Sequence, residues 1–340
     1  MSLAAAIRDR DVAELPGKRD EDWRWTDLRG LIRVLPEPSK PFEGDVGAGP
    51  FDPLADDRRV LVNGGAASIG IPAREEAAVS LRFVARGGGA HAAQATVTVG
   101  EGARLRLFES YESDGASVAQ TSLAIRLAAG ATLERIVLTA DDAEAVSVSE
   151  AEVQLSPGSQ FSQTVAAAGA RRQRLETRVL HPGGHAELRL DGIYLLADKR
   201  HSDQTTVVTH ASVDGSTVQL AKGVVRDQAR GVFQGRIVVE EGADRTDARM
   251  GHHALILSDR AEVDAKPELE IYADDVACAH GNTVGALDED ALFYARQRGM
   301  PEAEARALLT EAFIGEVVDR IGHDGAREVV RAWVADRLRA

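Results

Sequence analysis

The 340-residue sequence has one cysteine, Cys278, few aromatic residues and no excess of basic charge. A single cysteine excludes an intramolecular disulfide framework and is compatible with a reducing compartment. The formal net charge of −14 argues against nucleic acid or an anionic membrane as a partner. Aromatic residues make up only 4% of the chain, which argues against a sugar-binding or base-stacking surface.

Several common functional patterns are also missing from the sequence. No apolar run approaches the length of a transmembrane helix, and the apolar start at residues 1–7 is too short for a signal peptide. We therefore expect a soluble cytoplasmic protein. The sequence contains no P-loop pattern, no G-x-S-x-G elbow and no H-E-x-x-H helix. ATP binding through a P-loop, serine hydrolysis of that type and zinc proteolysis are thus not expected.

A repeat runs through the middle of the chain. Segments such as VTVGEGARLRL (97–107) and IRLAAGATLERI (125–136) each place a glycine between two strand-like runs. The aligned glycines are spaced 28, 28 and 26 residues apart, at Gly102, Gly130, Gly158 and Gly184. A fixed period of this size is typical of stacked coils that cannot bury an apolar face alone, so it predicts a β-solenoid. An evenly spaced β-sandwich is the competing interpretation.

Three zones follow from composition and periodicity. Residues 1–50 read as a short helical segment followed by a linker rich in proline and glycine. Residues 51–286 hold the alternating runs of the predicted β-helix core. Residues 287–340 are predicted to form a helical subdomain, because Asp288 can cap a helix and apolar residues then follow helical spacing. These helices could cap the solenoid or dock a partner.

The stretch LEIYADDVACAHGNTVG (269–285) is the most informative part of the chain. Strand side chains alternate between faces, so Cys278 and His280 would share one face if a strand runs through them. Both side chains are ligands for iron or zinc, but two ligands cannot complete a four-ligand site. The alternative is structural, with a buried cysteine and a hydrogen-bonded histidine.

The wider sequence around this pair closely resembles the signature of the SufB/SufD family of iron–sulfur cluster assembly proteins. The segment 266–276 (KPELEIYADDV) leads into CAHGNTVG at 278–285, a pattern that resembles the SufD branch rather than the glutamate-rich SufB branch. Further resemblance lies in residues 22–28 (DWRWTDL), 199–201 (KRH), 205, 210, 231–235 (GVFQG), 262–264 (EVD), 292–294 (LFY) and 298–299 (RG).

The resemblance implies a right-handed parallel β-helix that serves as a non-catalytic scaffold subunit. The implied partners are a SufB-like protein and a SufC-like ABC ATPase, and the isolated chain could form a homodimer. A nascent Fe–S cluster would be shared transiently with the SufB-like partner, with none held permanently by the isolated chain. His280 is the first choice for a metal ligand and Cys278 the second; no catalytic residue is assigned.

A second class of function is a free-standing, metal-dependent β-solenoid enzyme that uses His201, His210 and His280. The structural interpretation of His201 and His210 is that they form hydrogen bonds between neighbouring coils. A third interpretation is a purely structural homodimer. A chain that turns over a substrate alone would favour the enzyme, whereas co-purification with an ATPase and a SufB-like chain would favour the scaffold.

Overall fold

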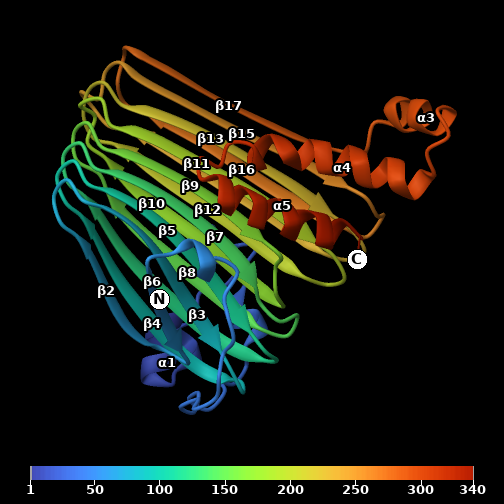
Figure 1. The fold of residues 1–340 in the computed structure, drawn as a ribbon, viewed down its shortest axis with the longest axis horizontal. Helices are drawn as coiled ribbons and strands as arrows, with labels where there is room; N and C mark the ends of the chain where they lie inside the picture. The colour runs from blue at the N-terminus through green and yellow to red at the C-terminus, as the bar shows by residue number, and fades with distance from the viewer. Residues whose placement is uncertain (1, 340) are drawn as a thin grey trace.

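The computed structural model of the protein describes residues 2–339, in which seventeen strands wind into a parallel β-solenoid (Figure 1). Consecutive strands alternate between a nine-stranded and an eight-stranded sheet, so each coil contributes one strand to each wall. Every pair of neighbouring strands is parallel. The prediction of a mainly β, parallel solenoid is therefore confirmed, and the sandwich interpretation is wrong.

The nine-stranded sheet consists of the odd-numbered strands in chain order. They are β1 (Asp57–Val62), β3 (Glu76–Ala85), β5 (Arg104–Ser113), β7 (Thr132–Ala140), β9 (Gln160–Ala167), β11 (Glu187–Leu196), β13 (Ser216–Val225), β15 (Thr246–Ile256) and β17 (Val276–Gly285).

The eight-stranded sheet consists of the even-numbered strands. They are β2 (Gly65–Ile71), β4 (Gly89–Val99), β6 (Ser117–Leu127), β8 (Val146–Gln154), β10 (Arg172–His181), β12 (His201–His210), β14 (Arg230–Val239) and β16 (Glu262–Ile271).

The repeated glycines lie in the turns that join the two walls. Gly102, Gly130 and Gly158 adopt φ values of 64°, 64° and 69°, a left-handed conformation that glycine reaches without a steric penalty. These turns also stack on one another: the Gly102 N–H donates to Ala129 O at 3.1 Å, and the Gly130 N–H donates to Pro157 O at 3.3 Å. The sequence period is thus the length of one coil.

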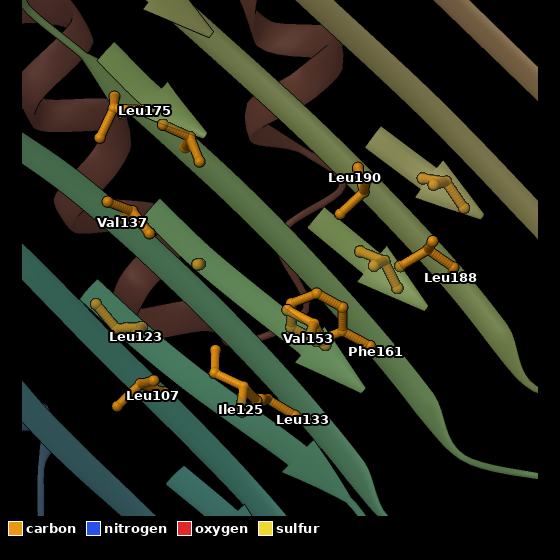
Figure 2. Packing of buried hydrophobic residues seen from close by; sticks show 14 of the residues in the cluster. Leu107, Leu123, Ile125, Leu133, Val137, Val153, Phe161, Leu175, Leu188 and Leu190 are labelled. Carbon is orange, nitrogen blue, oxygen red and sulfur yellow. The ribbon is translucent and has the colours of Figure 1, made fainter. Parts of the chain in front are cut away.

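The interior of the solenoid is filled by inward-facing side chains from both sheets. Leu107, Ile125, Leu133, Val153 and Phe161 lie in one continuous apolar cluster (Figure 2). Alternation along each strand places every second residue inside, which is why short alternating runs build one long core.

A charged pair is embedded in this interior. The Arg135 guanidinium donates to both oxygens of Glu109, at 2.9 and 2.7 Å, and both side chains are at most 3% exposed. Tyr111 and Gln163 complete the network, since the Tyr111 hydroxyl donates to Glu109 and Gln163 accepts from Arg135. The buried charges are therefore paired and hydrogen-bonded, as burial requires.

The N-terminal residues cover part of the outer face of the eight-stranded sheet. They form α1 (Leu3–Asp9), α2 (Leu28–Leu31) and the 3₁₀ turns η1 (Val12–Glu14) and η2 (Glu21–Trp23); η3 (Asp52–Leu54) follows an extended stretch. Leu3, Leu15 and Leu28 pack against Val146 and Val148 of β8.

The DWRWT motif fixes this segment to the sheet. Thr26 donates a hydrogen bond to the buried carboxylate of Asp203 at 2.5 Å, and the Arg174 guanidinium lies 4.4 Å from the Trp23 ring centroid. Arg174 also pairs with Asp203 at 2.7 Å. This part of the family-like pattern is therefore explained by packing between the two segments.

Three helices follow the solenoid: α3 (Glu289–Gln297), α4 (Glu302–Val318) and α5 (Asp324–Arg339). Asp288 caps α3 by accepting hydrogen bonds from Asp290 N and Ala291 N, as expected from its position before the helix. Helices α4 and α5 lie on the outer face of the nine-stranded sheet, where Ile314, Val317 and Val330 pack against the wall (Figure 1). They do not cap the end of the solenoid, so the capping expectation is wrong.

No helix within residues 2–339 combines the length and the apolar character needed to cross a bilayer.

Candidate functional site

The last coil of the solenoid ends in two edge strands. β16 has β14 as its neighbour in one sheet, and β17 has β15 in the other, with no strand beyond either in residues 2–339. Each strand therefore keeps one row of backbone donors and acceptors unpaired by strand neighbours. Large apolar side chains are also exposed here: Ile271 is 41% exposed, Tyr272 65% and Val284 42%. An unpaired edge with exposed apolar residues is a surface suited to another chain.

Both predicted ligands lie on β17, at this open end. Cys278 pairs in register with Ala248, and His280 pairs with Met250. Ala248 and Met250 belong to the interior core, so Cys278 and His280 share the inner side of the strand, as their spacing predicted. Cys278 is half-buried against the core, whereas His280 is exposed.

The two side chains differ in how ready they are to bind metal. Burial raises the pKa of the Cys278 thiol above its ordinary value, so the thiol is protonated at neutral pH. A metal must displace that proton, because the thiolate is the ligand. A neutral imidazole ligates without losing a proton. The exposure of His280, together with the raised pKa of the Cys278 thiol, ranks His280 ahead of Cys278 as a candidate ligand.

Sequence reasoning missed a polar group directly beside this pair. Asn282 is on the same side of β17, and its Oδ1 lies 2.6 Å from His252 Nδ1. The opposite nitrogen, His252 Nε2, lies 2.8 Å from the Tyr194 hydroxyl. Burial lowers the pKa of His252 to about 4, so the ring is neutral; Nδ1–H donates to Asn282 and Nε2 accepts from Tyr194.

The hydrogen-bonded group of Asn282, His252 and Tyr194 links the open end to the solenoid interior. His252 is fully buried and stacks on Phe233 at a centroid distance of 4.6 Å. The signal in the sequence was Asn282, two residues after His280 and therefore on the same side of the strand. Its partners His252 and Tyr194 are 30 and 88 residues away in the chain, and only the coil register brings them together.

The three histidines of the metal-dependent enzyme alternative do not lie close together. His201 is on the outer face of the eight-stranded sheet, where its Nε2 lies 3.0 Å from Trp25 O. His210 is inside, 4.4 Å from the His181 ring centroid and 3.0 Å from Thr217 Oγ1. No group of three or more metal-ligating side chains is gathered anywhere in residues 2–339. A metal-dependent hydrolase site built from His201, His210 and His280 is therefore not present.

The open end can thus offer one exposed imidazole and one half-buried thiol, on the same side of an edge strand. Two ligands leave a metal or cluster incompletely coordinated. A chain that pairs with the edge would approach the same place and could supply the remaining ligands.

Comparison with known proteins places the chain in a family. The family model described as "SUF system FeS cluster assembly, SufBD core domain" matches residues 83–313, which run from the end of β3 through β17 and into α4. The chain belongs to the SufBD family. The matched residues include the whole of β17 and its motif.

Individual SufBD relatives match over parts of the chain. The iron–sulfur cluster assembly protein SufD of Escherichia coli K12 is 32% identical over 241 residues, 70% of this chain and 57% of that protein. SufD of Bacillus subtilis is 34% identical over 124 residues, which is 36% of this chain and 28% of that protein. A SufBD family protein of Synechocystis, slr0076, is 40% identical over 127 residues, 37% of this chain and 28% of that protein. The matched region thus spans little more than half of these SufBD proteins at most.

Proposed function

We propose that the chain is a non-catalytic scaffold subunit of an iron–sulfur cluster assembly complex. The observation that carries this proposal is the coincidence of the two candidate ligands with the open end of the solenoid. A SufB-like chain would pair with this end, and the nascent cluster would form at the contact. The reducing cytoplasm is the compartment that suits a free thiol and a labile cluster.

The chemistry of β17 supports close approach by a partner. The side chains facing away from the interior are small, namely Ala277, Ala279, Gly281, Thr283 and Gly285. A Cβ on Gly281 or Gly285 would meet nothing within 4 Å, so the fold of the chain itself does not require glycine there. Glycine in a strand is explained when another backbone comes close. In the absence of a SufB-like chain, a second copy could occupy the same edge as a homodimer.

In this proposal the cluster is cargo rather than a resident cofactor. His280 would be the first ligand from this chain and Cys278 the second, with the remaining ligands from the partner. The isolated chain would hold no stable cluster, because one cysteine and one histidine cannot complete the coordination.

The helices supply a second surface, which we propose binds a SufC-like ATPase. The apolar residues Leu309, Phe313 and Val317 follow helical spacing along α4, but this stripe is not free as a whole. Val317 is fully buried, and Phe313 packs against the wall and Lys222. The most exposed large apolar residues of the helices are instead Phe293 and Tyr294 on α3, at 62% and 61% exposure, followed by Leu308 on α4 at 50%. Helix α3 projects beyond the sheet, where a partner can reach it (Figure 1).

Replacing Val284 with lysine tests the docking edge. Val284 is 42% exposed, so Val284→Lys should leave the fold intact. A charge placed on an edge strand opposes pairing with another strand, and we expect co-purification of the SufB-like chain to fall about tenfold, or about 1.4 kcal/mol. The measurement is the ratio of the two chains after affinity purification of the co-expressed complex.

Val60→Lys is the matched control for this edge. Val60 is 40% exposed and lies on β1, the edge strand at the opposite end of the same sheet. The control should retain the partner. Equal loss in both variants, or no loss in Val284→Lys, would place the docking surface elsewhere.

Phe293→Asp tests the ATPase surface. Because Phe293 is 62% exposed, the melting temperature should change little, while the lost apolar contact should weaken ATPase binding by about 1.5–3 kcal/mol. The measurement is a pull-down of the SufC-like ATPase paired with a thermal melt. Leu180→Asp is the control, because Leu180 is 45% exposed on the other sheet. Retained binding by Phe293→Asp would contradict the assignment.

A further inference from the structure

A cleft of about 500 Å³ lies between the helices and the solenoid, away from the open end. One side is formed by the first half of α4 and the last turn of α5, which lie at the same end of the sheet in Figure 1. The other side is formed by the ends of β11 and β13 and the turns that follow them. The volume is that of an ordinary small-molecule site.

The polar lining of this cleft is dominated by arginine. Its charged residues are Arg200, Arg226, Arg306, Arg337, Asp198 and Asp227. The lining therefore has a positive excess in a protein whose formal net charge is −14. Positive charge at this place is a local feature that the overall composition does not predict, and it favours an anionic ligand.

Two of the four arginines, Arg200 and Arg337, form no salt bridge within residues 2–339. Arg226 lies 4.0 Å from Asp227, and Arg306 lies 3.1 Å from Glu302. The Arg200 guanidinium instead donates from Nη1 to two backbone oxygens, those of Asp141 at 2.8 Å and Gly169 at 2.7 Å. Its Nε and Nη2 donors remain available, since a guanidinium has five N–H groups.

Arg337 is the second arginine without a salt bridge. Its guanidinium stacks 4.5 Å from the centroid of the Trp333 ring, which orients it without using its N–H donors. Burial lowers the pKa of Arg337, the positive charge of Arg200 lowers it further, and the neighbouring Asp336 carboxylate partly opposes both effects. Two cations held near each other are stabilised by an anion between them.

The remaining walls of the cleft are apolar. Leu195, Val224 and Leu257 come from the solenoid, and Leu338 and Ala307 come from the helices. A bare inorganic anion would use only the guanidinium donors, whereas an organic phosphate would also cover these walls. Guanidinium groups match phosphate oxygens in geometry and in charge.

We propose that this cleft binds a small phosphate ester, with its phosphate between Arg200 and Arg337 and its organic part against the leucines. The site is separate from the β17 edge, and its function does not depend on the cluster proposal. Inorganic phosphate could occupy the same position between the two arginines. A phosphate ester should bind more tightly than inorganic phosphate, because its organic part also contacts the apolar walls.

The test is calorimetric titration of the full chain with AMP, inorganic phosphate and adenosine at constant ionic strength. We expect AMP to bind with a Kd below about 1 mM, phosphate to bind about tenfold more weakly, and adenosine to show no binding. Arg337→Gln should weaken AMP binding at least about tenfold. Arg339→Gln is the control, because Arg339 is 73% exposed in the same turn of α5 and is not part of the cleft lining.

Arg306→Gln gives an independent result if Arg337→Gln fails to fold, because Arg306 lines the cleft from α4; it should also weaken AMP binding. Equal affinities for AMP and phosphate would assign the site to inorganic phosphate and keep the anion position. Absence of binding by both ligands, or equal AMP affinity in the wild type, Arg337→Gln and Arg306→Gln, would overturn the proposal. Binding of adenosine equal to that of AMP would also overturn it.

Discussion

His280→Ala should reduce cluster yield in the reconstituted complex at least tenfold while leaving the fold of the chain unchanged. His280 is exposed at the end of the core and shares the inner side of β17 with Cys278. Loss of one ligand from a shared site should weaken metal binding by at least about 1.4 kcal/mol. The measurement is iron–sulfur absorbance after anaerobic assembly with the SufB-like and SufC-like partners.

Cys278→Ser separates the two ligand assignments. Its effect on cluster yield should be equal to or smaller than that of His280→Ala, because the buried thiol must first lose a proton. A larger effect would reverse the ranking. His185→Ala is a suitable control, since His185 lies in the turn between β10 and β11, away from β17. Unchanged yield and unchanged growth under iron limitation for His280→Ala would count against His280 as a ligand.

Arg135→Met should destabilise the solenoid by about 3–5 kcal/mol, because it leaves the Glu109 carboxylate buried without its cation. The pair is bidentate and enclosed by the apolar core, so solvent cannot replace the lost partner. The measurement is the urea midpoint at neutral pH, with the slope of the transition compared between variants.

Two further variants show whether the buried charge is the cause. Glu109→Gln combined with Arg135→Met removes both charges and should recover at least half of the lost stability. Arg249→Met removes an exposed pair, since Arg249 is 68% exposed beside Asp247, and should change the free energy of unfolding by less than about 1 kcal/mol. Equal losses from Arg135→Met and Arg249→Met would refute the explanation.

The sequence by itself determined the coil period and the helical tail. Gly102, Gly130 and Gly158 mark turns whose left-handed backbone is local, so their spacing could be read directly. Asp288 likewise caps α3 through bonds within three residues. The shared side of Cys278 and His280 also follows from strand geometry alone.

Contacts between distant residues could not be read in this way. The group formed by Asn282, His252 and Tyr194 depends on which strand follows which in the stack. The apolar stripe on α4 was recognised from its periodicity, but periodicity does not say which surface buries it. Only the tertiary structure showed that Val317 is buried between α4 and the nine-stranded sheet. It also showed that Phe293 and Tyr294 on α3 are exposed.

The open end of the solenoid was also decided by tertiary structure. β17 has the alternation of a strand, and that pattern is the same whether a strand has one neighbour or two. Helices α4 and α5 fold back along the wall and leave β16 and β17 as edges. The sequence therefore determined which residues lie together on one strand, while the fold alone determined that this strand is an open edge, because exposure depends on how separate elements pack.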